Sequence, residues 1–257
     1  MRFLKVSTTA VLAVGLLMGA SAPGIAQSAY EQNVDYLVTS VGVPADDVQV
    51  RAEVVAGLED LAQSQAISVE QAAQRAADEY RSYAMDGSSE SMPAAAPQAE
   101  VASGGGRTVA LQSSKYIGDI FYSSNSTAGI PHGHNGIYYT NSNYVEAEGY
   151  KKFVRTVWAG SAIAPAPAYK YYVGWDKQSP NKIKAANFAL RQVGKPYNGI
   201  FFLNKTVNAT SYNCSQLVWA AYKSTDPNVD LDSNGGPGVY PTDIAKSSWV
   251  TLYETRF

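Results

Sequence analysis

The N-terminal third of the chain carries apolar residues at helical spacing. A first helix is expected after the acidic pair Asp46 and Asp47, which suits a helix start. The apolar face of this helix consists of Val48, Ala52, Val55 and Leu58. A second helix is expected from Ser68, with Gln71 at the offset of a capping box. Residues 30–85 are therefore predicted to form a small helical segment of two or three helices.

Residues 107–257 follow a different pattern, in which short aromatic-rich runs are separated by Gly, Asn and Pro. Such runs predict strands. The expected strands cover 117–122, 135–139, 143–147, 169–174 and 249–253. Two stretches have a helical period instead, and a third begins a short helical turn: 180–192, 214–222 and 241–244. Because helices and strands mix without a regular strand–helix–strand alternation, the pattern predicts an α+β domain with an antiparallel sheet.

The first 26 residues have the pattern of a secretory signal peptide. Arg2 and Lys5 precede the apolar run 10–20, and small residues follow it. Cleavage is expected after Ala26 or Ser28. A membrane anchor is the alternative, but the run is shorter than the roughly 20 apolar residues that span a bilayer. The mature protein is expected to be secreted or to lie in a bacterial cell envelope, without a transmembrane segment.

Residues 86–106 separate the two patterned regions. They are rich in Gly, Ser, Ala and Pro and have no apolar period, which is typical of a flexible linker. A helical segment at 30–85 on such a tether is expected to act as a lid or pro-segment over the domain at 107–257. An interaction or oligomerisation module is the alternative. A lid predicts that removal of residues 27–106 raises activity toward a small substrate.

Composition and charge limit the partners and the kinds of site that the protein can have. The chain has one Cys, two His and a net charge of −2, which becomes −4 once Arg2 and Lys5 leave with the signal peptide. The lack of a basic block argues against nucleic acid as a partner. A single Cys excludes an internal disulfide framework and a multi-cysteine zinc or iron–sulfur site, and no cofactor is expected. In an exported protein, a lone Cys is either a buried small hydrophobe or a working thiol.

The only cysteine, Cys214, stands at the start of the predicted helix 214–222. At that position the helix dipole and the free backbone N–H groups favour a thiolate. The same N–H groups can hold the oxyanion of a tetrahedral intermediate. A core cysteine does not need this position, so Cys214 is the candidate nucleophile.

A thiolate nucleophile needs an imidazole that accepts and returns its proton. His134 opens a predicted strand, which orients its ring, whereas His132 follows Pro131 in a loop. His134 is therefore the candidate base, and His132 is expected to be a solvated loop residue. The pair offers a metal ion two ligands and no evident third, so no metal site is expected.

The candidate base needs a third polar group that fixes its tautomer. The predicted hairpin after His134 returns through Glu146 and Glu148, whose side chains share one strand face. Either carboxylate can meet the imidazole from the adjacent strand, although Glu148 has the stronger case for being merely solvated.

Five motifs of the C-terminal domain, in this order, resemble those of the circularly permuted papain-like amidases. They are GDIF at 118–121, GHNGIY at 133–138, YVEA at 144–147, GKPYN at 194–198 and NCSQLV at 213–218. This YiiX/YaeF group belongs to the NlpC-type cysteine peptidases and is related to lecithin retinol acyltransferase. The histidine precedes the cysteine here, as the permutation requires, and the resemblance covers residues 112–253.

The resemblance implies a permuted papain-like domain, in which an antiparallel sheet packs on helices, with a Cys–His–polar triad. Cys214 matches the nucleophile, His134 the base and Glu146 the third position. Tyr197 matches a tyrosine that lines the site and can donate to the oxyanion, with ordinary aromatic packing as the alternative. Gln216 stands where Gly or Glu is commoner, so the flank of the helix is expected to differ.

The expected function is a secreted cysteine hydrolase that cleaves amide bonds through an acyl-enzyme. Cell-wall peptides are the substrate class suggested by analogy. A lipid esterase or acyltransferase on the same scaffold is an alternative that would need an apolar acyl tunnel. A non-catalytic binding protein is a further alternative, against which the intact Cys, His and Glu argue.

Overall fold

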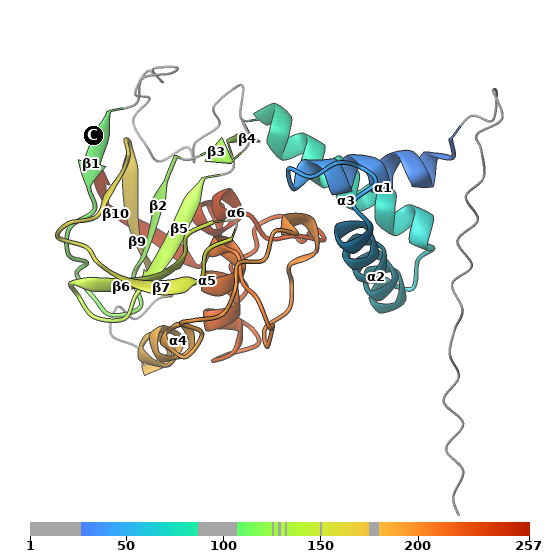
Figure 1. Cartoon of the computed structure of the whole chain (residues 1–257). Coiled ribbons are helices and arrows are strands. Elements are labelled where there is room, and N and C mark those ends of the chain that lie inside the picture. Colours follow the sequence, from blue (N-terminus) through green and yellow to red (C-terminus); the bar gives the residue numbers. More distant parts are fainter. Residues whose placement is uncertain are drawn as a thin grey trace, which may run out of the picture.

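The computed structural model describes residues 27–86, 107–124, 126–127, 130–131, 133–149, 151–174 and 180–257. Three helices come first and an α+β domain follows, and Figure 1 shows them side by side. The predicted signal peptide and nearly all of the predicted linker lie outside the described residues, so the division of the chain at those segments stays a prediction. In the part that is described, no helix is both long enough and apolar enough to cross a bilayer.

The three N-terminal helices begin where side chains cap them. They are α1 (Ala29–Ser40), α2 (Val48–Gln65) and α3 (Val69–Asp86). The carboxylate of Asp47 accepts a hydrogen bond of 2.9 Å from the backbone N–H of Val50 at the start of α2. Ser68 and Gln71 exchange side-chain-to-backbone hydrogen bonds of 3.0 and 3.2 Å at the start of α3. These bonds satisfy N–H groups that have no partner within the helix, which explains the helix starts.

A six-stranded antiparallel sheet forms the body of the α+β domain. From edge to edge its strands are β10 (Val250–Arg256), β9 (Ala168–Val173), β2 (Ile120–Ser123), β5 (His134–Tyr138), β6 (Asn143–Ala147) and β7 (Val154–Trp158). Two short ladders stand apart from it: β1 (Thr108–Ala110) with β8 (Ile163–Pro165), and β3 (Ser126–Thr127) with β4 (Ile130–Pro131). Ile137 of β5 lies opposite Val145 of β6, and Glu146 lies opposite Arg155 of β7.

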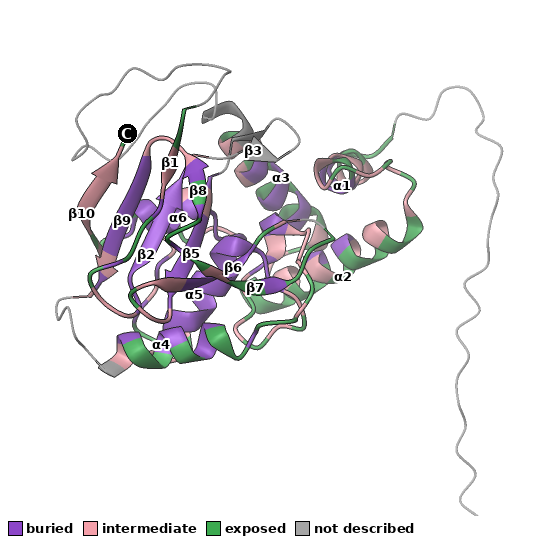
Figure 2. Cartoon of the chain, turned by 60° about the vertical axis from the view of Figure 1, so that its left-hand side comes forward, coloured by how far each residue is buried: buried purple, intermediate pink, exposed green. Residues whose placement is uncertain are grey.

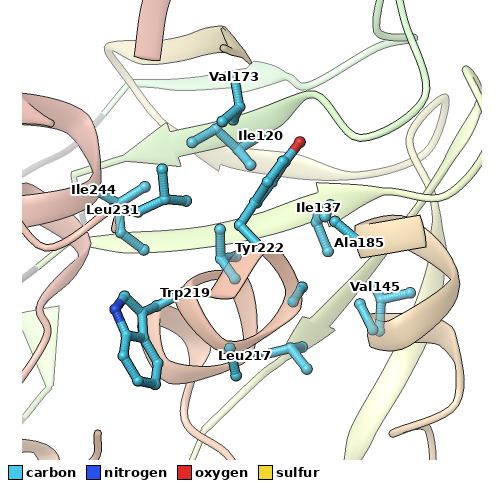
Figure 3. Packing of buried hydrophobic residues seen from close by; sticks show 14 of the residues in the cluster. Ile120, Ile137, Val145, Val173, Ala185, Leu217, Trp219, Tyr222, Leu231 and Ile244 are labelled. Atoms are coloured by element: carbon cyan, nitrogen blue, oxygen red, sulfur yellow. The ribbon is translucent and has the colours of Figure 1, made fainter. Parts of the chain in front are cut away.

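The sheet packs against helices that follow it in the sequence. These are α4 (Pro180–Leu190), the short 3₁₀ helix η1 (Phe201–Leu203), α5 (Cys214–Lys223) and α6 (Pro241–Lys246). Every residue of α5 from Cys214 to Tyr222 is buried, and Figure 2 shows this helix in purple behind the equally buried strands β2, β5 and β9. A helix that is buried on all sides belongs in the centre of a core, and the polar side chains of Ser215 and Gln216 are hydrogen-bonded there. Figure 3 shows Leu217 and Tyr222 of α5 among Ile120, Ile137 and Val145 of the sheet.

The helical segment α1–α3 shares its hydrophobic core with the α+β domain. Val34 and Leu58 are fully buried, and so are four alanines of α3: Ala72, Ala73, Ala76 and Ala77. Phe202 and Tyr240 of the domain complete the same cluster. The ring of Tyr80 meets Phe202 edge to face, and that of Tyr83 stacks on Tyr240 at 3.8 Å between centroids. Buried apolar side chains of the helices and of the α+β domain pack against each other. The helices are therefore attached to the domain by this packing and not only through the chain that connects them.

The expected α+β architecture with an antiparallel sheet on helices is confirmed, and the differences are local. The strand expected from residue 117 begins at Ile120, because Gly118 turns the chain with a φ of +84°. A side chain at Gly118 would also collide with Lys182. The strand β7 was not predicted, and neither was the separate helix α1 within the expected helical segment.

Candidate active site

Cys214 is the first residue of α5, and the chain on both sides holds this helix start in place. Asn213 caps the helix, since its Oδ1 accepts the backbone N–H of Gln216 at 2.9 Å. The hydroxyl of Ser215 donates to the carbonyl of Val239 at 2.7 Å. Cys214 is 2% exposed. Its own backbone N–H belongs to the first turn, where helical N–H groups are free to bind an anion.

His134 is the first residue of β5, and its ring meets the carboxylate of Glu146 on the neighbouring strand β6. His134 Nε2 lies 2.7 Å from Glu146 Oε2. The phenyl ring of Phe121 on β2 packs beside the imidazole, with 5.7 Å between ring centroids. The strand start, the carboxylate and the apolar ring together restrict the orientation of His134.

The imidazole of His134 also interacts with the side chain of Cys214, which favours the protonated ring. Because Glu146 occupies Nε2, Nδ1 is the ring nitrogen left for the sulfur. The site therefore contains a continuous chain from sulfur to imidazole to carboxylate. Such a chain is the arrangement that moves a proton away from a nucleophile and stabilises the resulting charge.

The electrostatics of the site favour a charged imidazole. Burial of His134 works against its charged form, but the hydrogen bonds and negative charges of Cys214 and Glu146 outweigh it and raise the pKa of His134 to about 10. Burial also acts on Glu146, yet His134 and Arg155 hold the pKa of this carboxyl below its usual range. At neutral pH, Glu146 is therefore an anion and His134 carries a proton.

Tyr197 lies in the loop between α4 and η1, close enough to Cys214 to be influenced by its charge. Burial of the ring, followed by the nearby charge of Cys214, raises the pKa of Tyr197, so its hydroxyl stays protonated and able to donate. Its ring meets Phe201 edge to face at 6.0 Å and contacts both hydrophobic clusters. The ring of Tyr197 thus packs in a core, and its hydroxyl is a donor within the electrostatic influence of Cys214.

Gln216 links the start of α5 to the loop that carries Tyr197. Its Oε1 accepts from Asn198 Nδ2 at 2.9 Å, and its Nε2 donates to the carbonyl of Thr206 at 3.1 Å. A glycine at this position could make neither bond. Gln216 therefore connects the helix start at Cys214 to the loop of Tyr197 through hydrogen bonds. The sequence motif alone did not indicate this role.

Arg155 is the second residue that sequence reasoning missed. It lies on β7 directly opposite Glu146, and its guanidinium donates to Glu146 Oε1 through Nε at 2.9 Å and Nη2 at 2.7 Å. The run Val154–Trp158 has the β-branched residues of a strand, which is the signal that could have found it. Glu148, the other candidate carboxylate, pairs with Arg155 and Lys152 instead of the imidazole.

The remaining expectations concern His132 and metal ions. His132 lies outside the described residues. Within the residues that are described, no three side chains of His, Cys, Asp or Glu are grouped to hold a metal ion.

Comparison with known proteins assigns the C-terminal part of the chain to a family. Residues 113–255 match the permuted papain-like amidase enzymes YaeF/YiiX, the C92 family. The uncharacterized protein YycO of Bacillus subtilis (strain 168) is 34% identical over 147 residues, which cover 54% of this chain and 56% of YycO. The chain thus spans little more than half the length of that relative. The crystal structure of the metalloprotein YiiX from Escherichia coli O157:H7 is 15% identical, with a TM-score of 0.38, over 55% of this chain and 98% of that one.

The family match covers more than half of the chain, including all four candidate site residues. It confirms the resemblance drawn from the five sequence motifs. The chain belongs to the permuted papain-like amidases of the YaeF/YiiX family, which are cysteine hydrolases.

Proposed function

We propose that Cys214, His134 and Glu146 form the catalytic triad of an amidase that works through an acyl-enzyme. The observation that carries the proposal is a single imidazole that is hydrogen-bonded to the carboxylate of Glu146 and interacts with the side chain of Cys214. A cysteine packed as a core residue would have no use for an oriented, protonated imidazole beside it.

In the acylation step, the Cys214 thiolate attacks the carbonyl carbon of the substrate, forming a C–S bond while the carbonyl electron pair moves to oxygen. The backbone N–H of Cys214 holds this oxyanion, and the Tyr197 hydroxyl is placed to donate a second hydrogen bond. When the C–N bond breaks, the proton on His134 Nδ1 passes to the leaving amine. The products of this step are a free amine and a thioester on Cys214.

In the deacylation step, neutral His134 takes a proton from a water molecule that attacks the thioester carbonyl. Collapse of the second tetrahedral intermediate breaks the C–S bond, which releases a carboxylic acid and restores the thiolate beside a protonated His134. Glu146 stays ionised throughout, because its task is to stabilise the imidazolium and keep Nδ1 turned toward the sulfur.

We propose cell-wall peptides as the substrate class and the cell envelope or its exterior as the place of action. The signal-peptide pattern of the first 26 residues supports export, and the peptide amides of the wall are the amides that an exported bacterial hydrolase meets. Lipid esters, by hydrolysis or acyl transfer, are the alternative substrate class on the same scaffold.

The deciding experiment is incubation of the purified protein with muropeptides and, separately, with phospholipid vesicles, followed by mass spectrometry. Cys214→Ala is the matched control, because it removes the sulfur and little volume. Cleaved muropeptides that require Cys214 would support the proposal, whereas products from phospholipids alone would replace it with the lipid alternative. No product from either class would leave the substrate proposal without support.

A non-catalytic binding protein predicts a different result in a simpler assay. Iodoacetamide at neutral pH should label Cys214 faster than a model thiol if the imidazole activates the sulfur. His134→Ala should slow the labelling to the rate of an ordinary buried thiol. Labelling of the native protein no faster than that of the model thiol would contradict an activated nucleophile.

We also propose that the helical segment α1–α3 controls the site through the loop of Tyr197. The support is that Tyr197 contacts the core shared by the helices and the domain, and that Tyr83 of α3 stacks on Tyr240 and donates to Asp243. Tyr83→Ala loosens this contact, and Tyr83→Phe is the control that keeps the ring. Higher activity of the alanine variant would mean that the helices act as a lid, and lower activity would mean that they hold Tyr197 in place.

A further inference from the structure

Arg155 and Glu146 make the most directional ion pair near the proposed triad. Two N–H groups of the guanidinium converge on one oxygen of Glu146, Oε1, at 2.7 and 2.9 Å. This leaves the other oxygen, Oε2, for the imidazole of His134 at 2.7 Å. Each oxygen of the carboxylate thus has its own partner, on opposite sides, and the group cannot rotate without breaking a bond to one of them.

Burial makes these partners necessary. The side chain of Glu146 is 5% exposed, while that of Arg155 is 48% exposed. A carboxylate removed from water needs a charged or hydrogen-bonding partner, or it takes up a proton. The charges that act on Glu146 are His134 from β5 and Arg155 from β7. Tyr144 on its own strand and Glu148, just after that strand, lie nearby. Of these groups, only Arg155 is positively charged at every pH at which the protein folds.

We propose that Arg155 is a positioning residue of the active site, which keeps Glu146 ionised and directs its Oε2 toward His134. The inference rests on the proposed triad and extends it by one residue on the outermost strand of the sheet. A protonated Glu146 would donate a hydrogen bond in place of accepting one, and the imidazolium would lose its counter-charge. Loss of Arg155 should therefore weaken the activation of Cys214, although Arg155 lies on β7 and Cys214 lies at the start of α5.

The test uses the full-length protein and follows alkylation of Cys214 by iodoacetamide from pH 4 to pH 9. Arg155→Met removes the charge and the donors but retains the aliphatic bulk. Its rate near pH 6 should fall about 10- to 100-fold, by analogy with the loss of a partner that orients a metal-binding histidine. The acidic limb of its pH profile should move to higher pH, because Glu146 without Arg155 takes up a proton more easily. Glu148→Gln is the matched control and should stay within about twofold of the native rate, since it removes the other partner of Arg155 only.

Arg155→Lys keeps the charge but not the paired donors, so its rate should lie between those of the native protein and Arg155→Met. This variant decides the matter if Arg155→Met does not fold. A purely structural role for Arg155 would lower the melting temperature without moving the acidic limb, and an unchanged limb with a native rate in a folded variant overturns the inference. A native protein labelled no faster than His134→Ala would instead contradict the triad itself.

Discussion

Glu79 offers a sharp test of how the helical segment is joined to the α+β domain. This carboxyl group lies on α3 and reaches across to the domain, where it accepts from the backbone N–H of Gly238 at 2.8 Å and from Asn234 Nδ2 at 3.3 Å. Burial, followed by the nearby charge of Asp243, raises its pKa to about 7, against the stabilising effect of the Gly238 hydrogen bond. The informative change is Glu79→Gln, which keeps the shape and one acceptor oxygen, enough for the Gly238 N–H, but cannot ionise.

The size of the expected change in stability follows from the shift in the pKa of Glu79. An ordinary pKa of 4.5 raised to about 7 corresponds to at most about 3 kcal/mol of difference between the two protonation states. The folded protein binds this proton more tightly than the unfolded chain does. The contribution of Glu79 to stability is therefore fully present below pH 4.5 and is lost as the pH rises through 7. Glutamine has no such loss, so the stability of Glu79→Gln relative to the native protein should increase by up to about 3 kcal/mol between pH 4.5 and pH 8.

The assay is urea unfolding of both proteins at several pH values across this range, followed by circular dichroism. The comparison isolates Glu79, because groups such as His134 titrate in both proteins and their effects largely cancel in the difference. An identical pH dependence of the two unfolding free energies would refute the reasoning. It would mean that Glu79 is solvated in solution and that the helices do not dock through it.

Three further changes test the site itself. Glu146→Gln should lower kcat by roughly 10²- to 10⁴-fold in a folded protein, because the neutral amide no longer stabilises the imidazolium; native kcat on a cleaved substrate would contradict the triad. Tyr197→Phe should lower kcat about 10²-fold with little change in KM if the hydroxyl holds the oxyanion, and unchanged steady-state kinetics would assign the ring to packing alone. Gly136→Ala should lower the unfolding free energy by about 1–3 kcal/mol, because the added carbon would lie 2.7 Å from the Phe121 ring and 2.8 Å from the Val145 carbonyl. Thermal melts measure the last effect, and a native melting temperature would show that β5 and β6 adjust without strain.

The parts of the site that the sequence predicted are those set by local pattern. The Asn-Cys pair before an amphipathic run predicted the helix start at Cys214, and capping by Asn213 is the reason that it begins there. The alternation after His134 predicted the hairpin whose second strand carries Glu146. Both depend on interactions between residues close in the chain, so composition and spacing were sufficient to predict them.

The sequence alone thus determined the family, the α+β class, the two elements that carry Cys214 and His134, and the capped starts of the helices α2 and α3. Only the tertiary structure decided which carboxylate meets the imidazole, that Arg155 holds it from a strand that was not predicted, and that Phe202 and Tyr240 complete the core of the helical segment. The physical reason is separation along the chain. Caps and periodicity act over three or four residues, whereas strand order and a shared core join residues far apart in sequence, and only the folded chain brings these together.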